Sequence, residues 1–283
     1  MRYPEYVAIG HVTNDIFPEE KMIGGSVVYS ALTAHYIGYS AGIITSFGSD
    51  FSSNGFLQGI HILNSVSDHT TTFCNVYNQG QRTQFVSHIA AKIAMSQIPE
   101  EWKGSKIIHL CPIADEIDEK IFDQFKNSLT ILTPQGLMRK WGEDGKVYPK
   151  RWLPSHKILS NIDIVIFSEE DIASFPEVIN DYQSSVDIVI LTRGVNGSIL
   201  YWNGQEYSFS AFPVEVKDPT GAGDVFAAAF SIKYYQTGNP IEASRFANYI
   251  ASFAVTEKGI FGIAKISKAV RKDNFNQFVL NLK

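Results

Sequence analysis

Cysteine is almost absent from this sequence, which contains only Cys74 and Cys111 among its 283 residues. Two cysteines are too few for a disulfide framework or a cysteine-based metal site, so the simplest interpretation places both in the core. The 7 histidines show no spacing typical of metal ligands. This scarcity excludes the disulfide-rich secreted proteins and the common zinc-binding classes.

The sequence also lacks long apolar runs and clusters of basic residues. No run approaches the roughly 20 apolar residues that span a bilayer, and residues 1–5 carry no signal-peptide core. The formal net charge is −5 and no basic stripe is visible, which argues against nucleic acid as the main partner. We therefore expect a soluble, cytoplasmic protein that binds neither membranes nor nucleic acid.

What the sequence does contain is a regular alternation of apolar, strand-like segments with helical patterns. Hydrophobic residues make up 45% of the chain, enough for a large core. Such alternation predicts an α/β fold with a mainly parallel sheet covered by helices on both faces. The strand-like segments are 6–10, 41–46, 106–111, 129–133, 162–167 and 187–191. No linker or repeat divides the chain, so we expect residues 1–283 to form a single domain.

The segment most informative about function runs from Val216 to Phe226, where a glycine turn precedes an alanine-rich helix. Backbone N–H groups at a helix start lack intrahelical acceptors, and the helix dipole adds positive potential, so such a turn binds phosphoryl groups. Gly221 and Gly223 permit close approach of the backbone. Asp224 falls in the first helical turn, where it can accept the proton of an attacking hydroxyl. A plain glycine turn with a helix-capping aspartate is the alternative.

The run Asp218-Pro219-Thr220-Gly221-Ala222-Gly223-Asp224 resembles the C-terminal signature of the ribokinase-like (PfkB) family of carbohydrate kinases, usually Asp-Thr-x-Gly-Ala-Gly-Asp. Further segments follow in the family's order, so the resemblance spans roughly residues 6 to 263. It implies a ribokinase-like three-layer fold with a small β-sheet lid, and a kinase that uses ATP and Mg²⁺. It also implies that Asp224 is the general base and that the amides of Gly221, Ala222 and Gly223 form an anion hole.

The acceptor site implied by the resemblance lies near the N-terminus. Asp15 is similar to the family aspartate that holds substrate hydroxyls, since a carboxylate accepts two hydrogen bonds; a simple turn aspartate is the alternative. Gly24 and Gly25 resemble the glycine pair beneath the bound sugar. The family often has asparagine shortly afterwards, whereas this chain has Tyr29, so the acceptor's identity stays open. Asp50, in a Gly-x-Asp stretch, is expected to cap a following helix.

The nucleotide site implied by the resemblance lies in the C-terminal half. Thr192, Gly194 and Gly197 follow a strand-like segment and resemble the family's Thr-x-Gly-x-x-Gly loop, although a plain glycine turn explains the same residues. Thr220 is assigned to the ATP site with them. Asn248 lies on an apolar helix similar to the segment that packs along the adenine, and an ordinary core helix fits that pattern equally well.

Two further positions concern the metal and the phosphates. Where the family usually shows Asn-x-x-Glu, this chain has Ser168 and Asp171, and the resemblance implies that Asp171 organises Mg²⁺ through water. An acidic first turn on a surface helix is the alternative. Arg139 either faces the nucleotide phosphates or lies on a helix surface. The Gln-Gly-x-x-Arg stretch at 135–139 resembles an inositol kinase-like branch, which tilts the acceptor towards a polyol or cyclitol.

Residues 70–90 differ from the rest because two β-rich stretches flank the turn-like residues 78–80, which predicts a hairpin. The resemblance assigns this hairpin, together with residues 11–23, to a lid that covers the substrate and excludes water. In the family such a lid often forms a dimer contact, which implies a homodimer here.

The resulting hypothesis is an ATP-dependent kinase that phosphorylates a hydroxyl of a small sugar, polyol or cyclitol. One alternative is a nucleoside kinase of the same fold, with an aromatic slot for the base supplied by Tyr29, Phe73 and Tyr77. The other is a non-catalytic sugar-sensing protein, which the departures at Tyr29 and Ser168 permit and the intact Asp224 disfavours.

Overall fold

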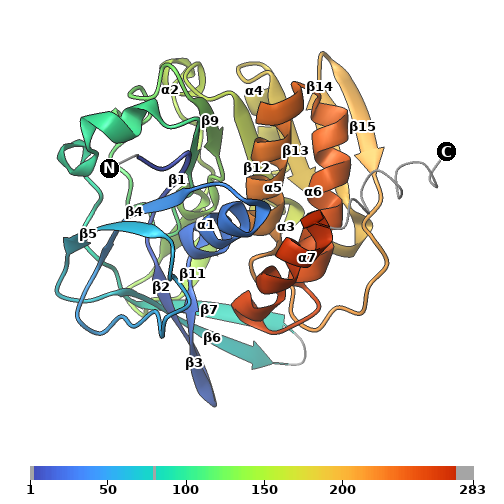
Figure 1. Ribbon diagram of the computed structural model, residues 1–283. Helices are drawn as coiled ribbons and strands as arrows, with labels where there is room; N and C mark the ends of the chain where they lie inside the picture. Colours follow the sequence, from blue (N-terminus) through green and yellow to red (C-terminus); the bar gives the residue numbers. More distant parts are fainter. Residues whose placement is uncertain (1–2, 79–80, 272–283) are drawn as a thin grey trace.

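The computed structural model describes residues 3–78 and 81–271 (Figure 1). Within these residues, 9 strands form one large sheet. In sheet order they are β15 (Gln205–Phe209), β14 (Ser198–Trp202), β13 (Ile188–Thr192), β12 (Ile164–Ser168), β9 (Leu129–Leu132), β8 (Ile107–Leu110), β1 (Tyr6–Ile9), β4 (Ala41–Phe47) and β5 (His61–Val66). Strands β13 to β5 pair in parallel, and β14 and β15 continue the edge antiparallel. The mainly parallel sheet predicted from the sequence is confirmed.

Helices lie on both faces of this sheet and complete three layers. They are α1 (Ser26–Ile37), α2 (His156–Leu159), α3 (Glu169–Ile172), α4 (Val178–Gln183), α5 (Ala222–Thr237), α6 (Pro240–Ala254) and α7 (Ile266–Arg271). Shorter 3₁₀ helices are η1 (Met95–Gln97), η2 (Glu100–Gly104), η3 (Glu119–Ile121), η4 (Gln135–Met138), η5 (Gly194–Asn196) and η6 (Gly259–Lys265). In Figure 1, α1, α5, α6 and α7 cover the near face. None of the helices in the described ranges is long and apolar enough to cross a membrane.

The two faces of β1 show how the sheet divides the core. Successive strand residues point to opposite faces, so Tyr6 and Ala8 pack with α1, α5 and α6. Val7 and Ile9 pack on the other side, in a cluster that includes Tyr182 of α4. All four strand residues are 0% exposed. A parallel strand covered on both faces needs such a continuous apolar run, which is why the sequence identified it.

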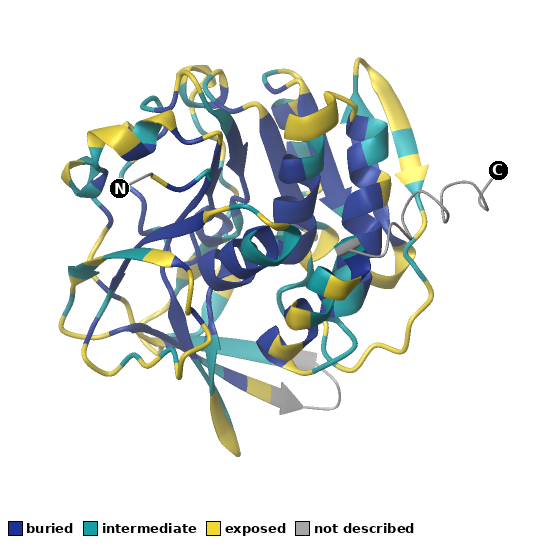
Figure 2. Ribbon diagram, viewed as in Figure 1, coloured by how far each residue is buried: buried dark blue, intermediate teal, exposed yellow. Residues whose placement is uncertain are grey.

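Helix α5 is buried through its middle, from Val225 to Ile232, where small alanines lie among larger apolar side chains (Figure 2). The alanines at positions 227–229 are each 0% exposed and let the helix lie close to the sheet and to α6. Helix α6 starts where the Asn239 side chain accepts hydrogen bonds from the N–H groups of Ile241 and Glu242, at 3.0 and 3.1 Å. Pro240 occupies the first helical position, which needs no N–H donor.

A second sheet of four strands lies below the large sheet in Figure 1. In order, its strands are β3 (Glu20–Gly24), β2 (Thr13–Phe17), β6 (Thr71–Asn78) and β7 (Gln81–His88). Strands β6 and β7 pair antiparallel as the hairpin predicted from the sequence, with residues 79–80 outside the described part of the chain. We call these four strands the small sheet.

The small sheet is attached to the rest of the protein on two sides. On one side, the Val86 N–H donates to the Gly145 carbonyl at 2.8 Å, in the turn between β10 (Arg139–Trp141) and β11 (Val147–Pro149). Phe73 and Val86 also form an apolar cluster with Trp141 of that hairpin. On the other side, β3 meets η6, where Met22 contacts Gly259 and Glu20 forms an ion pair with Lys258. Both contacts hold the small sheet near the C-terminal end of β1 and the turn that precedes α5.

The prediction of a helix after Asp50 is wrong. Residues 54–59 form turns instead, because Gly55 and Gly59 adopt φ angles of 80° and 86°, which no right-handed helix contains. The Asp50 carboxylate accepts hydrogen bonds from the Thr70 N–H and hydroxyl at 3.0 and 2.8 Å. Asp50 therefore joins this turn region to the start of β6, and it caps no helix.

The attachment of β7 predicts the effect of a mutation at Gly145. Its φ is 75°, and an added Cβ would lie 2.4 Å from the Val86 carbonyl oxygen. Gly204 has a φ of 70° but open space around it, so Gly204→Ala has only the backbone cost of a left-handed residue, about 1–2 kcal/mol. We expect Gly145→Ala to lower the melting temperature more than Gly204→Ala and to speed hydrogen exchange at the Val86 amide. Equal effects of the two variants would contradict this attachment.

Candidate active site

The start of α5 has the geometry expected of an anion site. Gly221 precedes the helix with φ 75°, and Asp224 is the third helical residue. The Ala222 N–H closes a turn onto the Pro219 carbonyl at 3.2 Å. The N–H groups that follow in the first turn point out of the helix without intrahelical acceptors, because no residue precedes them in the spiral. An anion placed there would meet these donors and the positive end of the helix dipole.

The Asp224 carboxylate is held in an environment that favours its neutral form. Burial raises the pKa of Asp224 to about 7, opposed by a hydrogen bond from the Ser26 side chain. The negative charge of Asp171 reinforces this rise, and the positive charge of Arg139 opposes it. A carboxyl group with a pKa near neutrality is suited to accept a proton and later release it.

Asp218, at the beginning of the same motif, has a structural task. Its Oδ1 accepts a hydrogen bond from the Thr220 N–H at 2.9 Å, and its Oδ2 accepts one from the Gly259 N–H at 2.8 Å. These bonds lower the pKa of Asp218 against the effect of its burial. Asp218 therefore joins the turn before α5 to the start of η6, and its bond to the Thr220 N–H fixes the backbone just before Gly221.

Asp15, Gly24 and Gly25 lie together where β2, β3 and α1 meet. Asp15 accepts a hydrogen bond from the Thr13 hydroxyl at 2.9 Å. An added Cβ on Gly24 would lie 2.2 Å from the Asp15 Oδ2, so a glycine is needed for the carboxylate to pack there. Gly25 has φ 96°, and its Cβ would lie 2.4 Å from the His11 carbonyl oxygen. The glycine pair thus makes room for protein groups in addition to any ligand.

The predicted nucleotide loop follows β13. Thr192 ends this strand, and Gly194 and Gly197 adopt φ angles of 52° and 84°. The space around Gly194 is open, whereas a Cβ on Gly197 would lie 1.9 Å from the Phe209 carbonyl oxygen. Gly197 therefore shapes the turn into β14, and Gly194 faces outward. Asn248 of α6 adjoins the loop and is 7% exposed, with its Nδ2 donating to the Ser198 hydroxyl at 2.8 Å.

Arg139 lies at the base of the β10–β11 hairpin and not on the surface of a helix. Its guanidinium carbon is 6.0 Å from the centre of the Phe73 ring. Phe73 pairs with Asp15 across β6 and β2, so the Arg139 side chain adjoins the acceptor side of the predicted site. Its charge also acts on Asp224. This position suits contact with a phosphoryl group between acceptor and donor.

Asp171 is held by hydrogen bonds at the start of α3. Its Oδ2 accepts from the N–H and hydroxyl of Ser168 at 2.9 and 2.8 Å, and its Oδ1 accepts from the Gln135 amide at 3.0 Å. A carboxylate offers about four acceptor positions, so these bonds leave little room for direct ligation. No group of three or more metal-binding side chains exists in residues 3–78 and 81–271. Any contact of Asp171 with Mg²⁺ would therefore run through water, and this role stays a prediction.

Tyr29 is the residue that sequence reasoning placed least well. Its ring is 3% exposed and packs against Gly221, and the charges of Asp15, Asp218 and Asp224 all raise its pKa, after the larger effect of burial. Tyr29 therefore lies near all three carboxylates, which include the predicted acceptor ligand and the predicted base. The sequence singled it out as a replacement of the family's usual asparagine and as part of an aromatic slot, and neither indicated its contact with Gly221.

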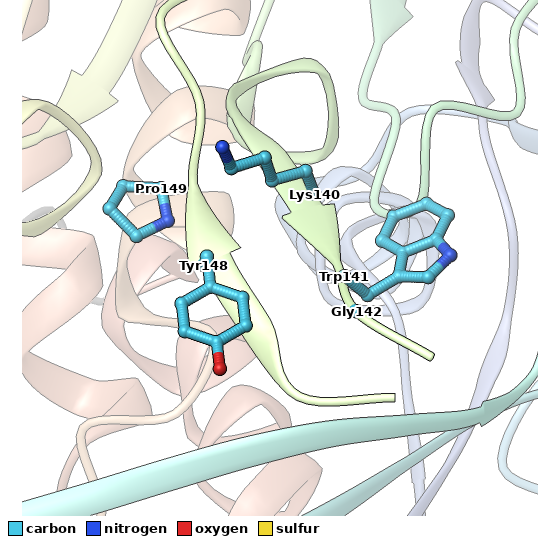
Figure 3. A pocket seen from close by; sticks show the side chains of 5 residues that line it. All are labelled: Lys140, Trp141, Gly142, Tyr148 and Pro149. Atoms are coloured by element: carbon cyan, nitrogen blue, oxygen red, sulfur yellow. The ribbon is translucent and has the colours of Figure 1, made fainter. Parts of the chain in front are cut away.

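The hairpin next to Arg139 forms a surface groove of about 580 Å³ (Figure 3). The lining residues are Lys140, Trp141, Gly142, Tyr148 and Pro149. Lys140 and Tyr148 face each other across the two strands. None of the residues that line this groove is a carboxylate, so none of them could act as a carboxylate base.

Comparison with known proteins adds to this geometry. A cytidine kinase from Thermococcus kodakarensis is 28% identical over 265 residues, which cover 84% of this chain and 91% of that protein. A pyrophosphate-dependent kinase in the ribokinase family, complexed with a pyrophosphate analog and myo-inositol, has a TM-score of 0.77 at 21% identity, covering 90% of this chain and 96% of that one. Arabidopsis thaliana ribokinase, complexed with ribose and ATP, has a TM-score of 0.73 at 22% identity, covering 95% and 98%.

The two solved structures share the fold of this chain, which confirms the ribokinase-like three-layer architecture with its small sheet. The similarity to the cytidine kinase extends over nearly the whole length of that protein. Residues 19–263, most of the chain, match the pfkB family of carbohydrate kinases. On this match and the motifs described above, the chain belongs to the pfkB family of carbohydrate kinases and is a kinase.

Proposed function

We propose that this kinase transfers the terminal phosphoryl group of ATP to a hydroxyl of a small sugar, polyol or cyclitol. The observation that carries the proposal is the partly buried Asp224 carboxylate in the first turn of α5, beside N–H groups that can bind an anion. A base and an anion site within one helical turn are the two parts that phosphoryl transfer to an alcohol requires.

The proposed reaction is an in-line displacement at the terminal phosphorus. The acceptor hydroxyl gives its proton to the Asp224 carboxylate as its oxygen bonds to phosphorus, while the bond from phosphorus to the bridging oxygen of the donor breaks. Charge on the transferring group is met by the N–H groups of the turn formed by Gly221, Ala222 and Gly223. Asp15 accepts hydrogen bonds from the other hydroxyls of the acceptor, with Gly24 and Gly25 beneath it.

The donor is proposed to lie along the loop after β13. Thr192, Gly194 and Gly197 would bind it, with Thr220 near the phosphates and Asn248 beside the loop. Arg139 would contact the phosphates from the acceptor side, which its proximity to Phe73 and Asp224 supports. Mg²⁺, when bound, would neutralise phosphate charge, held through water near Asp171.

A nucleoside is the second candidate acceptor, because the cytidine kinase relative aligns over 84% of this chain. The aromatic slot suggested by the sequence has little support from the side chains in place. Tyr29 and Phe73 are 3% and 2% exposed, so neighbouring protein groups already cover both rings. The side chain of Tyr77 lies outside the described residues. A base would therefore need another surface on which to stack.

We also propose that residues 1–283 act as one kinase domain in which residues 11–23 and 70–90 form the lid. The small sheet carries Asp15, and its strand β3 meets η6, which is bonded to the turn before α5, so a substrate between them would be shielded from water. A homodimer through this sheet is the corresponding proposal for assembly.

The acceptor and donor can be identified in one experiment. ADP or phosphate release is measured with Mg²⁺ across sugars, polyols, inositols and nucleosides, with either ATP or pyrophosphate as the donor. We expect turnover on one polyol, sugar or inositol with ATP, lowered about 10²- to 10⁴-fold in Asp224→Ala. Asp187→Ala, which removes an exposed aspartate, is the matched control and should keep full activity. Normal turnover by Asp224→Ala would refute the assignment, and donor binding without turnover would favour a sensor.

The raised pKa of Asp224 predicts a pH dependence. The carboxylate must be ionised to accept a proton, and its pKa is about 7. We therefore expect kcat/KM to fall as pH decreases through 7, because protonated Asp224 cannot act as a base. The measurement is kcat/KM for the acceptor between pH 5 and 9 at saturating donor. An acid limb near the ordinary aspartate value of 3.8 would contradict the role of burial.

The same pKa predicts that Asp224 lowers the stability of the protein. The folded state binds a proton more tightly than the unfolded state, whose pKa is near 3.8, so the stability falls as pH rises from 3.8 through about 7. Asp224→Asn removes this loss. We expect its melting temperature to match that of the wild type at pH 4 and to exceed it at pH 8. The exposed Asp187→Asn should show no such divergence, and a lower melting temperature of Asp224→Asn at pH 8 would contradict the argument.

A further inference from the structure

One face of α1 packs against the start of α5. Ser26, Tyr29 and Ser30 are spaced three and four residues apart, so their side chains lie on the same side of the helix. The Ser26 side chain acts on the Asp224 carboxylate, and the Ser30 hydroxyl donates to the Asp224 carbonyl at 3.4 Å. Tyr29, between them, contacts Gly221. The turn before Asp224 is therefore in contact with a helix that begins directly after Gly24 and Gly25.

The contact between Tyr29 and Gly221 is close enough to dictate the residue at position 221. An added Cβ on Gly221 would lie 2.1 Å from Cδ1 and 2.3 Å from Cε1 of the Tyr29 ring. Gly221 is also in the left-handed region, with φ 75°. Two separate constraints thus require glycine, and the first of them, the ring contact, exists only because Tyr29 is an aromatic residue.

The other end of the Tyr29 side chain reaches a third segment. A Cβ on Gly259, at the start of η6, would lie 3.8 Å from the Tyr29 hydroxyl oxygen. The Gly259 N–H in turn donates to Asp218, which also holds the Thr220 N–H. The ring therefore bridges α1, the turn before α5 and the start of η6.

We propose that Tyr29 is a positioning residue whose ring fixes the shape of the Gly221–Gly223 turn, so that its N–H groups are aimed at the transferring phosphoryl group. Glycine loses more conformational freedom on ordering than any other residue, and this turn contains two glycines. An anion site stabilises developing charge only if its donors are held in place before the reaction. The flat, covered ring supplies that constraint. This inference rests on the proposed phosphoryl transfer and deepens it.

The role differs from that of a substrate ligand. A ligand would act through the Tyr29 hydroxyl, whereas the proposed role belongs to the ring. Tyr29→Phe keeps the ring and removes the hydroxyl, and Tyr29→Ala removes both. Gly221→Ala disturbs the same contact from the other side. Gly238→Ala is its matched control, because Gly238 ends the same helix with φ 64° and has open space around it.

The experiment combines hydrogen exchange with kinetics on the full chain. Exchange is followed at the amides of Ala222 and Val225, which donate to Pro219 and Gly221 at 3.2 and 2.9 Å. We expect faster exchange there in Tyr29→Ala and Gly221→Ala, and wild-type exchange in Tyr29→Phe and Gly238→Ala. In turnover, Tyr29→Ala should lose about 10²-fold in kcat, the usual effect of displacing a catalytic group by about 1 Å. KM for the acceptor should change little, because Asp15 is untouched.

Each result decides the proposal. Wild-type exchange and kcat in Tyr29→Ala would overturn it, and so would a Tyr29→Phe protein as impaired as Tyr29→Ala, since the hydroxyl would then be the active part. If Tyr29→Ala does not fold, the comparison of Gly221→Ala with Gly238→Ala gives the answer. If the wild-type protein turns over no acceptor, the proposed kinase reaction fails, while the exchange data still test the contact between Tyr29 and the turn.

Discussion

The structure depends on holding one carboxylate at the partly buried start of a helix. A charged group is costly in such a place, and its cost is reflected in the pKa of Asp224, which burial raises to about 7. The surrounding elements can be understood as the means of holding it. Helix α5 is packed tightly by its alanines, so its first turn has a fixed position relative to the sheet. If this helix could shift, neither the burial of the Asp224 carboxylate nor the position of the turn would be fixed.

The elements around Asp224 come from distant parts of the sequence. Helix α1 contacts Gly221 through Tyr29, and its Ser26 side chain forms a hydrogen bond with the Asp224 carboxylate. The charge of Arg139 reaches Asp224 from the β10–β11 hairpin. Asp171, in α3 after β12, adds a negative charge that raises the pKa of Asp224 further. The C-terminal ends of parallel strands meet at one edge of a sheet, and this is where such separate segments converge. The parallel topology therefore brings together the proposed acceptor side, the proposed base and the proposed donor loop.

Much of this arrangement could be predicted from the sequence. Buried parallel strands appear as apolar runs, so β1, β4, β8, β9, β12 and β13 were all anticipated. The glycine turn before Asp224 was recognised because helix starts and glycines have distinct local chemistry. The helix after Asp50 was predicted and is absent, since Gly55 and Gly59 turn the chain instead. The local sequence pattern is therefore informative where neighbouring residues alone determine the backbone conformation.

Other features could not be predicted because they arise from contacts between segments far apart in the chain. Nothing in the local sequence says that Tyr29 lies on Gly221, or that Asp218 links its turn to Gly259. The position of Arg139 beside Phe73 likewise depends on how the β10–β11 hairpin packs under the small sheet. In each case the two partners are more than 40 positions apart in the sequence, so only the folded chain reveals the contact.

The two attachments of the small sheet differ in physical kind, and this difference has a consequence for ionic strength. The ion pair between Glu20 and Lys258 is exposed, with side chains 37% and 58% accessible, so dissolved salt screens it. The hydrogen bond from Val86 to Gly145 joins two backbone groups and is insensitive to salt. Concentrated salt therefore weakens the β3 side first and leaves the β7 side in place. Under those conditions the contact of Met22 with Gly259 remains on the β3 side, so the salt concentration sets how much more firmly the small sheet is held along β7 than along β3.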